Sequence, residues 1–161
     1  MSNEFKFNIG DSVYSPKFGL GKVLKVDFME SADTHFYVIE SFVNHTKLMV
    51  PVQASKKQLR WVATKEEVSK MLGLFSRPVE EQSFESKKDR VKFFKTQQKN
   101  VILKERVSAL AQLHSIKDKG KVEKEIFQKM LEDISNEFSH VLELSETEVN
   151  TTIVQNLSNV A

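Results

Sequence analysis

The chain has 161 residues, of which 40% are hydrophobic and 29% are charged, and its formal net charge is +2. This length accommodates one large domain or two small ones, and the hydrophobic fraction is ordinary for a globular protein. Cysteine is absent, which excludes disulfides, thiolate nucleophiles and cysteine-ligated metal sites.

The first sixty residues have the pattern of a small β-sheet. Short β-branched or aromatic runs alternate with turn-forming residues, and Gly10 and Gly19 stand where the backbone must reverse, with positive φ. We expect an SH3-like, five-stranded β barrel, in which the central third strand is apolar on both faces. Its strands are predicted at residues 13–15, 22–29, 35–43, 46–52 and 59–62.

A helix is predicted to follow this sheet. Thr64 and Glu67 have the spacing of a capping box, and an apolar stripe runs from Val68 to Phe75 before Arg77-Pro78 ends the helix. We place the domain boundary between residues 76 and 83, which gives an N-terminal domain at 1–76 and a second domain at 83–161.

The second domain is predicted to be all-α. Apolar residues recur at helical spacing within 91–98, 103–114 and 127–141, and Ser145-Glu146-Thr147-Glu148 opens a last short helix. The fold class expected for the chain is therefore α+β with two domains, a barrel followed by a helical domain.

Basic residues are concentrated in the middle of the chain. Residues 86–121 hold 11 Lys and Arg against 3 Asp and Glu, while residues 122–161 hold 2 against 8. The helix predicted here carries Lys87, Lys88, Arg90, Lys92 and Lys95, and helical geometry puts Lys88, Lys92, Lys95 and Lys99 along one face. Such a stripe can follow a phosphate backbone, or it can be an ordinary solvated face. The basic residues that continue it favour a polyanionic partner: Lys104, Arg106, Lys117, Lys119 and Lys121.

Phe84 follows a polar link and directly precedes this basic helix. An apolar ring beside cationic contacts is the arrangement that minor-groove binders use to insert a wedge at a base step. The alternative is that the ring packs at the seam between the domains.

Nothing in the sequence predicts catalysis. The four histidines are far apart with no metal-ligand spacing, and no nucleophile elbow of the G-x-S-x-G kind occurs. We therefore expect no enzyme, no metal and no cofactor. Without a long apolar run or a signal-peptide layout at the N-terminus, we also expect a cytoplasmic protein with no membrane association.

The chain resembles the CarD/CdnL family of bacterial transcription regulators over nearly its whole length. The similar segments are residues 7–16, residues 18–23, the strand end Met49-Val50-Pro51-Val52, and Leu59-Arg60 shortly before a helix. A helical C-terminal half that starts with a basic helix follows in the same order.

The resemblance implies a Tudor-like N-terminal domain that docks on the β subunit of RNA polymerase, and a helical domain that contacts promoter DNA at the upstream edge of the transcription bubble. In the family a tryptophan wedges into the minor groove there, and by position this falls on Phe84, which lacks the indole N–H donor. At the polymerase-facing strands, arginines of some members correspond to Met29 and Met49, so that Lys25 and Lys47 would supply the charge.

These observations predict a non-enzymatic transcription regulator that modulates open-complex stability. It would act as a monomer and bind the minor groove and phosphates of promoter DNA with little sequence specificity. The expected DNA-binding residues are Phe84, Lys87, Lys88, Arg90, Lys92 and Lys95, and the expected polymerase-binding residues are Lys25, Met29, Lys47 and Met49. The alternative is an SH3-like adaptor that binds an acidic protein partner or RNA.

Overall fold

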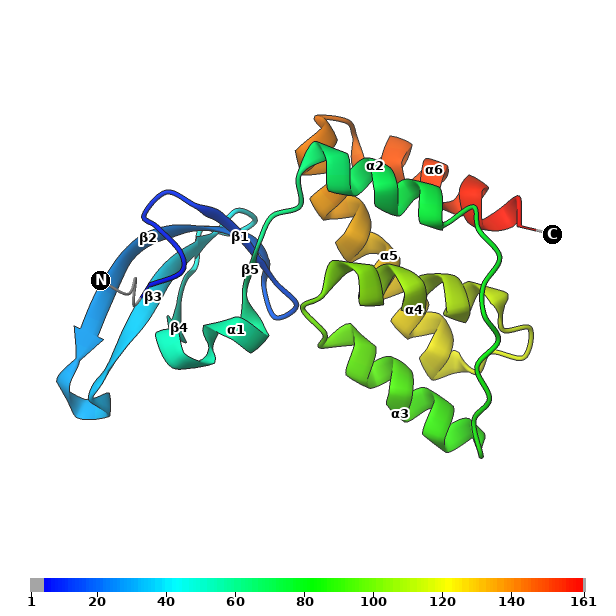
Figure 1. Cartoon of the computed structure of the whole chain (residues 1–161), viewed down its shortest axis with the longest axis horizontal. Helices are drawn as coiled ribbons and strands as arrows, with labels where there is room; N and C mark the ends of the chain where they lie inside the picture. The colour runs from blue at the N-terminus through cyan, green and yellow to red at the C-terminus, as the bar shows by residue number, and fades with distance from the viewer. Residues whose placement is uncertain (1–4, 161) are drawn as a thin grey trace. The chain divides into compact units, whose positions relative to one another are not determined.

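The computed structural model describes residues 5–160. By its internal contacts the chain divides into two compact units, Met1–Val62 and Ala63–Ala161. The first is built on strands and the second on helices, so the chain is of mixed α+β class (Figure 1).

The first unit is a five-stranded antiparallel sheet with the strand order β4-β3-β2-β1-β5. Each predicted strand is present within a few residues of its predicted limits. At two turns Gly10 and Gly19 adopt φ of 94° and 78°, as the sequence predicted. The strands are β1 Ser12–Ser15, β2 Gly19–Met29, β3 Thr34–Ser41, β4 Lys47–Pro51 and β5 Arg60–Trp61.

The sheet is not closed into a barrel, which corrects the prediction. Over residues 5–160 no pairing joins β4 to β5, and these two strands remain the edges. The segment between them folds into a short 3-10 helix (η2, Val52–Ala54) and a one-turn helix (α1, Ser55–Gln58) instead of extended chain. Because β5 is only two residues long, it offers little backbone for a second ladder.

One face of the sheet carries the core of this unit. Tyr37 and Ile39 on β3 are fully buried there, while Phe36, Val38 and Glu40 project from the opposite face because side chains alternate along a strand. The buried cluster consists of Phe7, Val13, Val23, Tyr37, Ile39, Val50 and Leu59.

Within residues 63–160 the second unit holds five helices around one apolar core. Thr64 and Ser145 cap the first and last of them by accepting the backbone N–H groups of Glu67 and Glu148, as predicted. Helix α4 lies against α3 and α5, and α6 lies beside α2 and α5 (Figure 1). The helices are α2 Lys65–Leu74, α3 Lys87–Gln98, α4 Leu103–Ser115, α5 Lys121–Leu142 and α6 Glu146–Ser158.

Helix α2 packs with the helical unit, whereas the sequence-based limits placed it with the sheet. Its buried Val68 belongs to the helical core. The side chain of Asn156 donates to the carbonyl of Leu72 at 3.0 Å, and the N–H of Ala63 donates to Glu137 Oε2 at 2.9 Å. The apolar stripe on α2 is therefore satisfied by the helices that follow it, and the domain limits 1–76 and 83–161 stay a prediction.

No helix within residues 5–160 combines the length and the apolar character needed to cross a membrane.

Candidate functional site

Helix α3, the predicted basic helix, is held firmly at its start and on its inner face. Ser86 caps it by accepting the N–H of Asp89 at 3.1 Å. Phe94 is fully buried in the helical core, and Phe93 is half-buried beside it. With one face anchored on α4 and α5, the opposite face of α3 has a fixed direction.

That opposite face carries Lys88, Lys92 and Lys95, and the C-cap residue Lys99 continues the row. We call these four lysines the basic stripe. At about 100° of rotation per residue, these four positions fall within roughly 60° of one another. All four side chains are exposed, and none has an ion-pair partner within the part of the chain that the structure describes. The predicted cationic face therefore exists, and no carboxylate among the described residues pairs with it.

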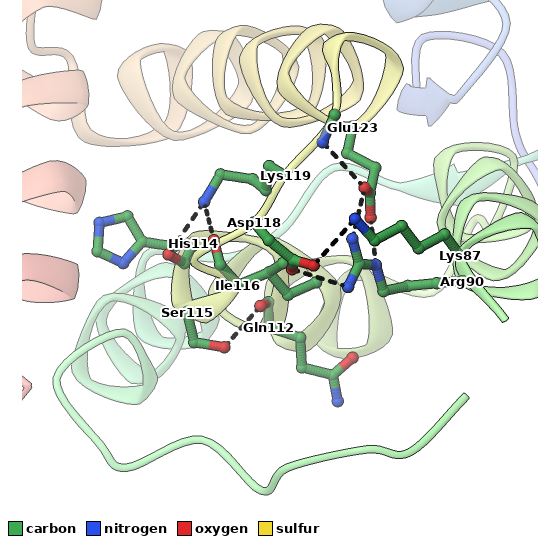
Figure 2. A network of polar contacts seen from close by, with 10 residues as sticks. Lys87, Arg90, Gln112, His114, Ser115, Ile116, Asp118, Lys119 and Glu123 are labelled. Carbon is green, nitrogen blue, oxygen red and sulfur yellow. Dashed lines mark hydrogen bonds and ion pairs between the residues drawn. The ribbon is translucent and has the colours of Figure 1, made fainter. Parts of the chain in front are cut away.

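Lys87 and Arg90 were predicted to bind DNA together with the stripe. In the structure they form ion pairs with carboxylates of the helical unit (Figure 2). Arg90 makes a bidentate ion pair with Glu123, with Nε–Oε2 at 2.7 Å and Nη2–Oε1 at 2.8 Å, and its Nη1 lies 3.1 Å from Asp118 Oδ1. Lys87 Nζ lies 3.2 Å from Asp118 Oδ2. We call these four residues the Asp118–Glu123 network.

The contacts within the network favour the ionised forms of Arg90, Asp118 and Glu123. Hydrogen bonding to Arg90 lowers the pKa of Glu123 despite the burial of that carboxyl. The same contacts raise the pKa of the Arg90 guanidinium. Hydrogen bonds from Lys87 and then Arg90 lower the pKa of Asp118. The guanidinium of Arg90 is therefore committed to carboxylates, and its side chain is only 13% exposed.

Two further basic residues that the sequence assigned to the cationic surface face inward. Lys119 Nζ donates to the carbonyls of Ile116 at 2.6 Å and His114 at 3.3 Å, which caps the C-terminus of α4 (Figure 2). Arg106 is 2% exposed and binds Asp133 at 2.6 Å and the carbonyl of Gln98 at 2.5 Å. Their charges stabilise helix ends, as expected for cations at a helix C-terminus.

Phe84 does not stand free of the core. Its ring is half-buried and lies 5.4 Å from the Phe93 ring and 6.1 Å from the Phe94 ring, measured between centroids. It also lines a cavity of about 230 Å³ together with Arg90, Ile116 and Asp118. Although its neighbours in sequence are polar, Phe84 therefore packs against the helical core through these two phenylalanines of α3.

The four predicted polymerase-binding residues lie on one face of the sheet. The register pairs Lys25 with Val38 and Val38 with Met49, so these three form one row across β2, β3 and β4. Met29 and Lys47 lie in other rows of the same face, which is the face opposite the core. Met29 is 37% exposed and Met49 is 46% exposed, so the face presents apolar and charged side chains together. Lys25 Nζ lies 3.0 Å from Asp27 Oδ2 on the same face.

Sequence reasoning missed Asp118 and Glu123, which decide how much of α3 is free. Two local signals could have indicated the role of Glu123 and the side of the helix on which Lys87 and Arg90 lie, but neither marks Asp118. Glu123 stands three residues after Gly120, whose N–H donates to Glu123 Oε1 at 3.2 Å, as a capping glutamate does. In helical rotation, Lys87 and Arg90 fall on the side of Phe94 and not on the side of Lys88.

Among residues 5–160 no group of three or more His, Asp or Glu side chains is placed to hold a metal ion. A scan against protein-family models gives no match, and a search of the curated proteins gives no match either.

Proposed function

We propose that this protein is a transcription regulator that docks on the β subunit of RNA polymerase through its sheet and grips promoter DNA beside the melted region through its helical unit. It acts as a cytoplasmic monomer that reaches the nucleoid with polymerase. The proposal rests on the resemblance of the chain to the CarD/CdnL family, and the observation that carries it is the basic stripe.

The stripe has the properties that a phosphate-binding surface needs. Its four ammonium groups are exposed, lie on one face of a rigid helix and have no carboxylate partner within the described residues. Contacts of this kind neutralise phosphates without reading bases, so they contribute affinity and little sequence specificity. A regulator built this way would act at many promoters.

The sheet unit supports the docking half of the proposal. Its outer face joins the exposed apolar side chains Met29 and Met49 to the cations Lys25 and Lys47. Strand β4 is an edge, and its only paired neighbour in the described chain is β3. An edge strand with exposed backbone groups can add a strand from a partner protein. Both features suit a protein partner with a strand-forming surface.

The proposed effect on initiation follows from differential binding. A protein that binds the open complex more tightly than the closed one shifts their ratio by the difference in affinity and by no more. A preference of about 1.4 kcal/mol changes the ratio tenfold. Phosphate contacts from the stripe that form only when the upstream DNA takes its open-complex path would supply such a preference.

The test measures binding of the intact chain to a forked DNA duplex at several salt concentrations. The double variant Lys88→Glu/Lys92→Glu should bind much more weakly, and the slope of log K against log salt should flatten by about 0.9 for each phosphate that the variant no longer neutralises. The matched control is Lys65→Glu/Lys70→Glu, which makes the same charge change at exposed positions of α2 and should retain wild-type binding. Equal slopes for the wild type and the stripe variant would remove the nucleic-acid function.

A second measurement tests the docking half. Tagged full-length protein should retain RNA polymerase from a nuclease-treated lysate, and Lys25→Glu/Lys47→Glu on the outer sheet face should reduce that retention. Recovery of a different dominant partner after nuclease treatment would favour the adaptor over the transcription regulator.

A further inference from the structure

We propose that Asp118 competes with nucleic-acid phosphate for Lys87 and thereby limits how many phosphates helix α3 can neutralise. The inference rests on the proposed function, because it concerns the strength of the same DNA-binding surface.

The two carboxylates of the Asp118–Glu123 network have different roles. Glu123 is 3% exposed and satisfies Arg90 with both of its oxygens. Asp118 is 58% exposed and divides its oxygens, with Oδ1 on Arg90 and Oδ2 on Lys87. Since Arg90 already has a bidentate partner, Asp118 is the residue that neutralises Lys87.

Lys87 is positioned to change partner. Its side chain is 73% exposed, and Lys88 of the basic stripe follows it directly in the chain. In Figure 2 Lys87 reaches across to Asp118 from the start of α3. Exposed ion pairs of this kind contribute little to the stability of a protein, so a phosphate can replace the carboxylate at little cost.

Asp118 also stands in a basic stretch of chain. Lys117, Lys119 and Lys121 surround it in sequence, and its loop joins α4 to α5. A carboxylate here repels a phosphate that approaches the start of α3, in addition to holding Lys87. The expected result is a DNA surface that is weaker than its lysine content allows, and a binding site for phosphate that opens when the carboxylate is neutralised.

The experiment measures the salt dependence of binding of the intact chain to a fluorescein-labelled forked DNA duplex by anisotropy. In Asp118→Asn the slope of log K against log salt should steepen by about 0.9, the value for one more neutralised phosphate on duplex DNA. The same relation gives binding up to roughly eightfold tighter at 0.1 M salt. Adding Lys87→Gln to this variant should return the slope to the wild-type value.

Two controls separate the mechanism from general effects. Glu125→Gln removes the same charge from an exposed position of α5 and should leave the slope unchanged. If its slope steepened as much as that of Asp118→Asn, net charge alone would account for the effect, and the inference would be overturned. Lys87→Gln alone should leave the slope nearly unchanged, because Lys87 is already paired with Asp118. A decrease of about 0.9 in that single variant would show that Lys87 binds phosphate despite Asp118, which also overturns it.

The outcomes distinguish this inference from the proposed function. Salt-dependent binding by the wild type, together with an unchanged slope in Asp118→Asn, would overturn the competition and leave the DNA-binding function intact. An absence of salt-dependent binding in both the wild type and Asp118→Asn would overturn the proposed function itself. Thermal unfolding of each variant shows whether it is folded, and Lys87→Gln supplies a test that leaves Asp118 in place.

Discussion

Arg90 and Glu123 join the start of α3 to the first turn of α5 by a bidentate ion pair, with Nε–Oε2 at 2.7 Å and Nη2–Oε1 at 2.8 Å. Both side chains are largely removed from solvent, at 13% and 3% exposure. This pair fixes the direction of the helix that carries the basic stripe, so it links the stability of the helical unit to the geometry of its proposed DNA surface.

Glu123→Gln should destabilise the helical unit. The change leaves the guanidinium of Arg90 partly buried without its main counter-charge. We expect the free energy of unfolding to decrease by about 2–3 kcal/mol, which is at or below the lower end of the range for broken buried ion pairs. Urea unfolding followed by far-ultraviolet circular dichroism measures the change. Glu125→Gln, at an exposed position of the same helix, should stay within about 0.5 kcal/mol of the wild type. Equal midpoints for the two variants would contradict the structural role of the pair.

The same carboxyl predicts a loss of stability in acid. Hydrogen bonding to Arg90 lowers the pKa of Glu123 in the folded state, while the unfolded value is about 4.3. A depressed folded-state pKa contributes stability that is present above the unfolded value and is lost as the pH falls through the folded one. At pH values under about 5, the free energy of unfolding of the wild type should therefore decrease as the pH is lowered. That of Glu123→Gln should decrease less steeply. Parallel curves for the two proteins below this pH would remove the assignment.

His114 predicts a second pH dependence, at higher pH. Burial and then the nearby charge of Lys119 lower the pKa of this imidazole. Because the unfolded chain, with a pKa of about 6.5, takes up the proton first, stability should decrease as the pH falls through that value towards the lower folded-state pKa. Urea midpoints between pH 8 and pH 5.5 measure this loss, which His114→Gln should reduce. An unchanged pH profile in the variant would assign the loss to other groups.

Local signals predicted most of the elements. The caps at Thr64 and Ser145, the turns at Gly10 and Gly19 and the stripe on α3 each depend on residues a few positions apart, so spacing alone revealed them. Features that depend on partners distant in sequence were not predictable in this way. The open edge between β4 and β5 is such a feature, since it depends on how residues 52–58 fold.

The candidate surfaces show the same division. The alternation of side chains in β2 and β4, combined with the register, brought Lys25 and Met49 into one row. The sequence could not show that Asp118, in a loop beyond the next helix, would bind Lys87. The neighbours of Phe84 in sequence are polar and gave no sign of a packing partner, whereas its neighbours in space are Phe93 and Phe94.

Gly21→Ala should destabilise the sheet unit. A Cβ atom at this position would lie 2.7 Å from Ile39 Cγ2 and 2.9 Å from the carbonyl oxygen of Glu40, so the central strands would have to move apart. Overpacking of this kind costs about 1–3 kcal/mol. Gly73→Ala is the matched control, because a Cβ there meets no atom within 4 Å and alanine is the better helix former by about 1 kcal/mol. Denaturant unfolding measures the free energy of unfolding of both variants. An unchanged value in Gly21→Ala would show that the strands can adjust.

Phe84 can be tested for a role beyond packing. If its ring acts at the upstream edge of the bubble, Phe84→Ala should shorten the lifetime of open complexes while polymerase binding stays unchanged. Loss of a half-buried ring also costs stability, so alanine alone is not decisive. Phe84→Leu keeps most of the apolar packing against Phe93 and Phe94 but removes the flat ring that can enter a base step.

A wedge role therefore predicts different orders for stability and for open-complex lifetime. Thermal unfolding should rank Phe84→Leu close to the wild type, while the open-complex lifetime should fall in both the leucine and the alanine variants. Phe84→Trp, which introduces the residue that the family resemblance implies, should lengthen the lifetime, because the larger ring covers more of a base and adds an N–H donor. Competitor-challenge assays on one promoter measure all the lifetimes. If the lifetime follows thermal stability across the three variants, Phe84 only packs against α3, and the lysines of the basic stripe carry the proposed contact with DNA.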